Sequence, residues 1–291
     1  MSMNLVIGGS GLVGGHIVAA MREQGLEARG TFLTSSDAGE GLQLDVCNVA
    51  TVEALVAATR PGAVILAAAA ANVDACELDP EASYRINVEG TANVVAAARR
   101  TGAAVILLST DYVFDGTSGP YRECAPVRPV CVYGLHKVFA ELNVAARAPQ
   151  PLIVRTTVVY GPEQRRKNFA ARLRHELNAG RRLRVPMDQV GTPTYAPDLA
   201  RAVVACLENR VTGAVHIVGG ERMSRYEFAV RAAQGFGLNP SLIEAVPTAA
   251  LKQSAPRPLS AGMVLSDAVV ALGVRMRTVE EAIADMARGP V

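Results

Sequence analysis

The sequence lacks the long apolar runs of a membrane protein and the high charge of a disordered chain. It has no tryptophan and only 4% aromatic residues, yet half of its 291 residues are hydrophobic and 19% are charged. Its longest apolar run, Ala63–Ala71, is well short of the ~18 residues that cross a bilayer. The first residues also lack the basic and apolar regions of a secretory signal. We therefore expect a folded protein of the cytoplasm, with no membrane partner.

Metal-ligand spacing and excess charge are also missing. The five cysteines are scattered, form no CxxC pair and have no histidine at zinc-ligand spacing, so we expect reduced thiols and no metal. The net charge of +2 provides no field that would attract nucleic acid. One Arg-rich stretch, from Arg165 to Arg184, lacks interleaved aromatics and is typical of a solvated helix face or of a site for a small anion.

Short apolar runs alternate with helical patterns through the first half of the chain. Strands separated by helices, and apolar on both sides, indicate a parallel sheet that is covered on both faces. The sequence therefore predicts an α/β fold, a Rossmann-type doubly wound parallel sheet. The expected strands are Asn4–Ile7, Glu27–Phe32, Leu42–Val46, Ala63–Ala67, Ala103–Ser109, Pro151–Thr156 and Gly213–Val218. The expected helices are His16–Gln24, Val49–Thr59, Glu81–Arg100, Val132–Ala148, Phe169–Asn178 and Ser224–Gln234.

The alternation becomes irregular beyond about residue 157, where prolines interrupt the pattern. This favours a smaller C-terminal lobe over the carboxyl ends of the strands. We expect one unit over residues 1–291, with a cofactor lobe at about 1–156 and 196–218. The second lobe would comprise about 157–195 and 219–291.

A glycine-rich turn follows the first strand. Gly8, Gly9, Gly11 and Gly14 satisfy both GxxGxxG and GxGxxG and lead directly into a helical pattern. Glycine allows a tight turn and a close approach of the backbone to a pyrophosphate, and the helix N-terminus stabilises the anion. This position after a first parallel strand predicts a dinucleotide-binding turn rather than a plain tight turn.

Tyr133 and Lys137 lie four residues apart, on one face of a predicted helix. With 7 Tyr and only 3 Lys in the chain, chance predicts about 0.07 such pairs. A nearby ammonium favours a phenolate, so we expect Lys137 to lower the pKa of Tyr133 towards a value useful for acid–base catalysis. The alternative is a surface tyrosine beside a solvated lysine.

The strand that ends near Ser109 is followed by Thr110, at the sheet edge where α/β proteins bind ligands. A hydroxyl there can hydrogen-bond to a substrate carbonyl and to the Tyr133 phenol. The same Ser-Thr-Asp segment is equally typical of a helix cap or a turn.

These motifs together resemble a known family. GGSGLVG, LDV, AANVDACE, STDYVFDG, YGLHK, VRTTVVYG, DQVGTPTYAPDLA and APRPLSAGMVL extend nearly end to end and resemble the extended short-chain dehydrogenase/reductases. STDYVFDG and DQVGTPT are most similar to the dTDP-4-dehydrorhamnose reductase branch, which includes the regulatory subunit of methionine adenosyltransferase. Family members commonly have Thr where this chain has Ala71 and a small residue at His136, both on the expected substrate side. The resemblance therefore supports the reaction type better than the substrate.

The resemblance implies a set of site residues. Thr110, Tyr133 and Lys137 would be catalytic. The cofactor would contact Gly8, Ser10, Gly11, Leu12, Val13, Gly14, Thr34, Ser35, Asp45, Val46, Ala67, Ala68, Ala69, Asn87, Tyr133 and Lys137, with Asp45 and Val46 at the adenine. The substrate would contact Asn72, Val113, Phe114, Asn168, Thr192 and Arg257, with the Arg257 guanidinium at a pyrophosphate.

The implied function is reduction of a 4-keto-6-deoxy sugar nucleotide at C4, with Tyr133 as proton donor. We expect NADPH rather than NADH, although NADH stays open, because hydroxyl residues and no acid before Asp37 follow the second strand. Two other functions remain open: a non-catalytic nucleotide-binding regulatory subunit, and a reductase of a non-nucleotide carbonyl compound. A homodimer is also left open.

Overall fold

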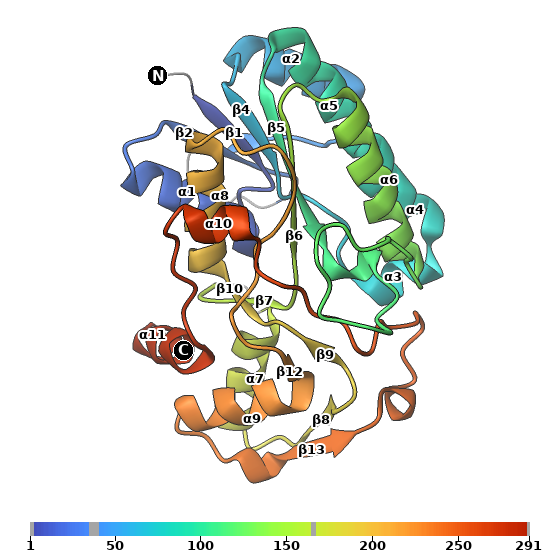
Figure 1. Cartoon of the computed structure of the whole chain (residues 1–291), viewed down its shortest axis with the longest axis vertical. Coiled ribbons are helices and arrows are strands. Elements are labelled where there is room, and N and C mark those ends of the chain that lie inside the picture. The colour runs from blue at the N-terminus through green and yellow to red at the C-terminus, as the bar shows by residue number, and fades with distance from the viewer. Residues whose placement is uncertain (1–2, 35–40, 164–166, 290–291) are drawn as a thin grey trace.

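Seven parallel strands form the central sheet of the computed structural model, which describes residues 3–34, 41–163 and 167–289 (Figure 1). The strand order is β11-β6-β5-β4-β1-β2-β3, and the register is parallel at each pairing. The strands are β1 (Asn4–Ile7), β2 (Ala28–Phe32), β3 (Leu42–Gln43), β4 (Ala63–Leu66), β5 (Ala104–Thr110), β6 (Pro151–Thr156) and β11 (Gly213–His216). The order reverses at β1 and β4, so ligands are expected at the carboxyl ends of these strands.

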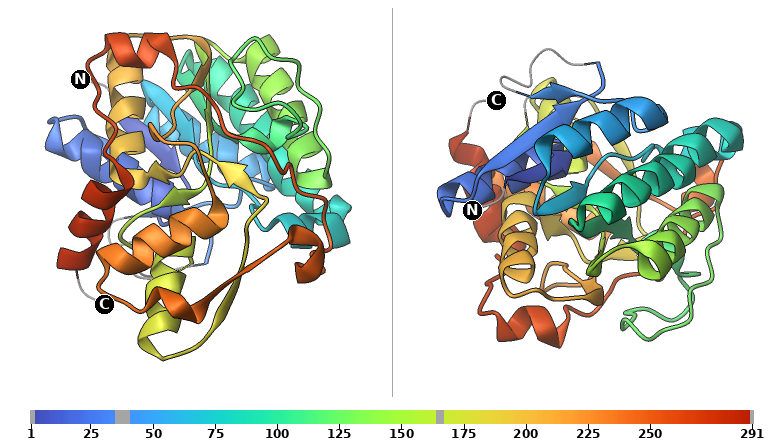
Figure 2. Two further views of the ribbon diagram at one scale, coloured as in Figure 1. Left: turned by 60° about the horizontal axis from the view of Figure 1, so that its bottom comes forward. Right: turned by 90° about the horizontal axis from the view of Figure 1, so that it is seen from above.

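Helices cover both faces of this sheet (Figure 2). Val6 packs with residues of α1, α8 and α10, whereas Leu5 and Ile7 face α2, α5 and α6. This division follows from the two-residue period of a strand, which sends successive side chains to opposite faces. The helices are α1 (Leu12–Glu23), α2 (Val49–Thr59), α5 (Gly90–Thr101), α6 (Val132–Arg147), α8 (Ala196–Glu208) and α10 (Asp267–Ala271).

The doubly wound fold predicted from the sequence is confirmed, with local corrections to single elements. The first helix begins at Leu12 instead of His16, and the last strand of the sheet ends at His216 instead of Val218. The third strand ends at Gln43 instead of Val46. The expected helix over Glu81–Arg100 is wrong as a single element, because a π-helical turn over Arg85–Glu89 separates α4 from α5. The short helices α3 (Val73–Leu78) and α4 (Pro80–Tyr84) precede that turn, with Asn72 and Asp79 as their caps.

The second group of elements lies beyond the carboxyl ends of the strands (Figure 1). It contains three two-stranded sheets and a separate hydrophobic core that includes Tyr160, Phe228 and Ile283. Its elements are β7 (Val159–Tyr160), α7 (Phe169–Asn178), β8 (Leu183–Pro186), β9 (Val190–Gly191), β10 (Thr194–Tyr195), β12 (Met223–Ser224), α9 (Arg225–Gly235), β13 (Ile243–Val246) and α11 (Val279–Arg288). Within the residues described, no helix is long and apolar enough to cross a membrane.

The chain returns from this lobe to the main sheet before it ends. Val269 of α10 belongs to the core on the α1 and α8 face, and Leu265 and Met276 pack against that core. The sequence predicts that the second lobe includes all residues from about 219 to 291, and the exact division of the chain into lobes stays a prediction. The segment around α10, however, packs on the main sheet.

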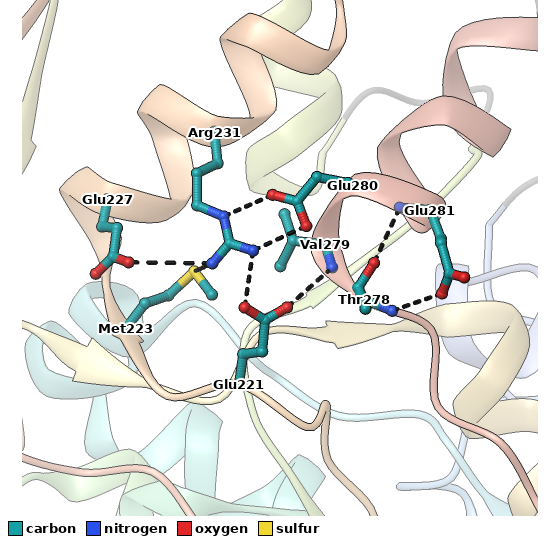
Figure 3. Close-up of polar contacts among 8 residues, drawn as sticks. All are labelled: Glu221, Met223, Glu227, Arg231, Thr278, Val279, Glu280 and Glu281. Carbon is teal, nitrogen blue, oxygen red and sulfur yellow. Dashed lines mark hydrogen bonds and ion pairs between the residues drawn. The ribbon is translucent and has the colours of Figure 1, made fainter.

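Arg231 of α9 holds the last helix onto the lobe (Figure 3). Its guanidinium bonds to Glu280 of α11 at 2.7 Å and to Glu221 at 2.7 Å. Glu221 also accepts a bond from the Val279 amide at 3.4 Å, and a capping box between Thr278 and Glu281 begins α11. These contacts connect distant segments around one guanidinium.

Candidate active site

A cleft of about 1380 Å³ lies between the sheet and the second lobe. Residues at or just beyond the carboxyl ends of β1, β4, β5 and β6 line its floor, among them Ser10, Ala67, Thr110 and Thr157. The opposite wall includes Asn168, Val190 and Arg225 of the second lobe. The cleft is therefore built from both parts of the molecule, at the sheet edge where open α/β sheets bind ligands.

The glycine turn has the geometry that a dinucleotide requires. Gly8 has a φ of 87°, and a Cβ on Gly14 would lie 2.2 Å from the Gly8 carbonyl oxygen. A Cβ on Gly9 would lie 2.4 Å from the Cα of Gly30, so the turn packs directly on β2. The N-cap of α1 is Gly11, which provides no side-chain cap, and the first amides of this helix are free to bind an anion.

The predicted cofactor residues of this turn divide into two groups. Ser10, Gly11, Leu12 and Val13 line the cleft, whereas Gly8 and Gly14 lie behind it and allow the close packing.

The segment after β4 forms the next part of the floor. Ala67 and Ala69 line the cleft, and the amides of Ala67 and Ala68 both donate to the Ile7 carbonyl at 2.9 Å. Asn87 lies behind this segment: its side chain accepts from the Ala70 amide at 3.0 Å and donates to the Ala70 carbonyl at 3.1 Å. Asn87 thus positions the floor, and it does not line the cleft.

The residues expected at the adenosine are less closely grouped. Thr34 is exposed and does not line the cleft, and Ser35 lies outside the described residues, as does Asp37. Asp45 accepts a bond from the Cys47 amide at 2.9 Å, and the Val46 carbonyl accepts one from Asn93. Neither lines the cleft, so their contact with adenine stays a prediction.

The structure brings Thr110, Tyr133 and Lys137 together on one side of the cleft. Thr110 ends β5, and the other two residues project from the first turns of α6. A Cβ on Gly134 would lie 2.1 Å from the Tyr112 carbonyl, so the glycine beside Tyr133 allows α6 to approach the end of β5. The Lys137 ammonium donates to the Leu108 carbonyl at 2.7 Å.

The expected lowering of the Tyr133 pKa is wrong for the protein in this state. Burial is the largest cause, and with the nearby Asp111 charge it raises the pKa of Tyr133, although a hydrogen bond with Thr110 acts in the opposite direction. Burial also lowers the pKa of Lys137 to about 8, against the nearby Glu141 carboxylate, which raises it. The Leu108 carbonyl of β5 holds the Lys137 ammonium in place, and this contact could not be predicted from the spacing of residues in the sequence.

Asp111 is a site residue that the sequence reasoning did not single out. It is 4% exposed, lines the cleft and accepts hydrogen bonds from Thr157 at 2.7 Å and Thr110 at 3.2 Å. Burial raises the pKa of this carboxyl, while the two hydroxyl donors lower it. Its position directly after Thr110 in the STD segment was the available signal.

A buried ion pair lies next to the three predicted catalytic residues in the chain, on β6 and α6. Arg155 of β6 bonds to Glu141 of α6 at 2.7 and 3.0 Å, and the Ser109 hydroxyl donates to the same carboxylate at 2.5 Å. The two charged side chains are 8% and 7% exposed. Glu141 is one helical turn beyond Lys137, so this network connects α6 to the strands that end at the cleft.

Among the predicted substrate residues, Asn168 lines the cleft. Its amide nitrogen donates to the Gly161 carbonyl at 2.9 Å and to Glu163 at 2.7 Å, and its oxygen accepts from the Ala171 amide. All of these bonds are local, so Asn168 shapes the loop that leads into α7.

The other predicted substrate residues do not line the cleft. Val113 and Phe114 are fully buried in a small core, where Phe114 stacks on Tyr121 at 4.3 Å, which corrects the expectation that their side chains contact substrate. Asn72 caps α3, and Thr192 is buried and accepts a bond from the Met263 amide.

Arg257 is held away from the cleft by an ion pair. Its guanidinium bonds to Asp74 of α3 at 2.8 Å and to the Ala255 carbonyl at 3.1 Å, and its side chain is 7% exposed. Asp74 also accepts from the Ala255 amide, so the pair holds the segment around Pro258 against α3. Contact between Arg257 and a pyrophosphate stays a prediction, and in this structure the charge of Arg257 is balanced.

The two departures from the family pattern have different positions. Ala71 lines the cleft, as expected. His136 does not: it is 6% exposed, its Nδ1 lies 2.8 Å from the Ser83 hydroxyl, and Tyr84 contacts the ring edge-on. His136 therefore packs against α4, and the sequence-based placement on the substrate side is corrected.

Three further cleft residues were missed at the level of the sequence. Arg225 begins α9, Gln189 precedes β9, and His16 lies in the first turns of α1 with its Nε2 3.0 Å from the Pro162 carbonyl oxygen. They come from segments far apart in the chain. His16 follows the glycine turn and Gln189 lies within DQVGTPT, so these motifs were the available signals, whereas Arg225 lies outside every quoted motif. Of the expected Arg-rich stretch, Arg165 and Arg166 lie outside the described residues, and Lys167 lines the cleft. The described arginines from Arg172 to Arg184 do not line it.

Comparison with known proteins agrees with this geometry. A family model described as the RmlD substrate binding domain matches residues 2–289. The chain is 32% identical to the dTDP-4-dehydrorhamnose reductase of Aggregatibacter actinomycetemcomitans over 80% of this chain and 83% of that protein. The chain belongs to this family. The resemblance inferred from STDYVFDG and DQVGTPT is thereby confirmed.

Two other relatives of the RmlD substrate binding domain family bear on function. A crystal structure of dTDP-4-dehydrorhamnose reductase from Bacillus anthracis in complex with NADP superimposes with a TM-score of 0.87 at 26% identity, covering 98% of this chain and 99% of that one. The chain is also 30% identical to methionine adenosyltransferase 2 subunit beta of Xenopus tropicalis, over 81% of this chain and 73% of that protein.

Proposed function

We propose that this member of the family is an NADPH-dependent reductase that converts the C4 carbonyl of a 4-keto-6-deoxy sugar nucleotide to an alcohol. The observation that carries the proposal is the joint placement of the glycine turn and of Thr110, Tyr133 and Lys137 in one cleft. Similarity to dTDP-4-dehydrorhamnose reductases supports the substrate class.

The glycine turn fits a nicotinamide dinucleotide by its own geometry. The positive φ at Gly8, the missing Cβ at Gly14 and the uncapped start of α1 leave room and amide donors for a diphosphate. The turn over residues 8–14 would hold that diphosphate, and Ala67 and Ala69 would contact the cofactor beyond it. When bound, the reduced nicotinamide supplies the hydride that adds to the carbonyl carbon.

The protein residues supply the proton and the orientation. Tyr133 is protonated at neutral pH, because burial and the Asp111 charge raise its pKa. It transfers its phenolic proton to the carbonyl oxygen as negative charge develops there. The Thr110 hydroxyl, whose single proton is donated to Asp111 in this structure, would turn to donate a hydrogen bond to the same oxygen. The Lys137 ammonium lowers the cost of the resulting phenolate, and it would contact the ribose of a bound cofactor.

The preference for NADPH over NADH remains part of the proposal. No acidic residue is present from Thr31 to Ser36, where an NAD-specific site normally provides a carboxylate to the ribose. Equal or tighter binding of NADH in a titration would contradict this preference.

The direct test of the activity is NADPH oxidation in the presence of dTDP-4-dehydro-6-deoxy sugar. Tyr133→Phe is expected to lower kcat by ~10² to 10⁴ and to retain NADPH binding, because only the proton donor is lost. Tyr160→Phe is the matched control, since it removes a buried phenol outside the cleft. Wild-type kcat in Tyr133→Phe would refute the assigned role. Equal turnover of free keto sugars would favour the non-nucleotide reductase instead.

A second candidate function is a nucleotide-binding regulatory subunit. The similarity to methionine adenosyltransferase 2 subunit beta favours it. The two candidates differ in turnover: a regulatory subunit would bind NADPH, fail to oxidise it with any sugar nucleotide, and co-purify in fixed stoichiometry with an enzyme partner.

A further inference from the structure

Arg225 is a cation in the cleft that the proposed chemistry does not use. It is the first residue of α9, and its backbone amide donates to the Gln189 carbonyl at 2.8 Å. That bond fixes the start of the helix next to β9, and the side chain lines the same cleft as Tyr133. The guanidinium lies over the Phe169 ring, 5.1 Å from its centroid.

No ion pair between described residues involves Arg225, although its environment makes an unbalanced charge costly. Burial is the main cause that lowers its pKa, and the charges of Arg172 and Arg257 act in the same direction. The charges of Tyr112 and Asp111 oppose burial, and each acts on the Arg225 pKa more strongly than Arg172 or Arg257 does. The Asp111 oxygens accept bonds from Thr110 and Thr157, and among the described residues Asp111 forms no ion pair with Arg225, although its charge still acts on that guanidinium.

Arg172 and Arg257, the two arginines whose charges act on Arg225, are less able to bind a ligand in the cleft. Arg257 is bonded to Asp74, and Arg172 is exposed and does not line the cleft. Arg225 is therefore the guanidinium that a ligand meets in this part of the described cleft. A guanidinium fork without an acidic partner, next to other positive charge, is complementary to phosphate oxygens.

The size of the cleft leaves room for a second phosphate-bearing ligand beside the cofactor. Its volume of about 1380 Å³ exceeds the roughly 300 to 1,000 Å³ of a typical single-ligand pocket. The glycine turn provides the anion site for one diphosphate at the floor, and Arg225 lies on the opposite wall, in the second lobe.

From this placement we infer that Arg225, rather than Arg257, binds the diphosphate of the sugar nucleotide and selects nucleotide-linked substrates. The inference rests on the proposed function for the identity of the ligand. It assigns to Arg225 the diphosphate-binding role that the family resemblance implied for Arg257.

Isothermal titration calorimetry of dTDP and of thymidine with the whole 291-residue chain, saturated with NADP⁺, tests the inference. The pair isolates the diphosphate, because both probes carry the same nucleoside. Arg225→Gln is expected to weaken dTDP binding about tenfold or more and to leave thymidine and NADPH binding unchanged. Arg225→Lys should retain part of the dTDP affinity, because it keeps the charge and loses the fork.

Arg184→Gln is the matched control, since it removes the same charge from an exposed position of β8 outside the cleft. Thermal unfolding of each variant verifies that the fold is intact. Wild-type dTDP affinity in Arg225→Gln, an equal loss for thymidine, or no dTDP binding by the wild-type protein would overturn the inference. A diphosphate-specific loss without turnover of the keto sugar would instead refute the reductase proposal and leave the role of Arg225 standing.

Discussion

Replacing Glu141 with glutamine removes the charge that balances Arg155 in the protein interior. The two side chains are 7% and 8% exposed and share bonds of 2.7 and 3.0 Å. Removal of one partner of a buried pair typically lowers the free energy of unfolding by about 3 to 5 kcal/mol, because the remaining charge stays desolvated. With an entropy of unfolding of ~2.1 cal/mol/K per residue, this loss corresponds to about 5 to 8 °C in Tm for a chain of this length.

A surface pair provides the control. Glu53 bonds to Arg100 at 2.6 Å, with side chains 37% and 65% exposed, so Glu53→Gln is expected to cost less than about 1 kcal/mol. Scanning calorimetry and urea unfolding of both variants measure the difference. A double variant, Glu141→Met with Arg155→Met, is expected to recover most of the stability, because no unpaired charge remains.

The outcome separates electrostatics from packing. Equal Tm shifts in Glu141→Gln and Glu53→Gln would refute the argument from desolvation. If the double variant is less stable than Glu141→Gln alone, the loss comes from disrupted packing and hydrogen bonding instead of the unpaired Arg155 charge.

Three further predictions concern the site itself. The pKa of Lys137 is lowered to about 8, so its side chain is charged below that pH. We therefore expect kcat/KM to decline as the pH rises through about 8, and a profile that is flat to pH 9.5 would contradict this. Asn87→Leu should weaken NADPH binding in a fluorescence titration, because both backbone groups of Ala70 lose their side-chain partner, and undiminished affinity would show that the floor segment needs no anchor. Gly14→Ala should abolish NADPH binding, because its Cβ would lie 2.2 Å from the Gly8 carbonyl oxygen. Gly220→Ala is the control, since a Cβ there meets open space, and it should bind NADPH as the wild type does. Equal binding by both variants would argue against a steric need for glycine at position 14.

Much of the fold was predictable because its signals are local. The strands Asn4–Ile7 and Pro151–Thr156 and the helix Val49–Thr59 have the predicted bounds, since each is an apolar run or period enclosed by turn residues. The π-helical turn over Arg85–Glu89 was not predictable, because its residues continue a helical pattern. It lies where Asn87 bonds across to Ala70, which is a tertiary contact.

The sequence by itself identified the residues that we propose for cofactor binding and catalysis, through the glycine spacing over residues 8–14 and the four-residue separation of Tyr133 and Lys137. Both patterns act within one turn of the chain, so they need no knowledge of distant segments. Only the tertiary structure decided the environment of those residues: burial raises the Tyr133 pKa, and a strand carbonyl holds Lys137. It also decided that Asp74 occupies Arg257 while Arg225 lines the cleft, because ion pairs and desolvation depend on residues that are far apart in the sequence.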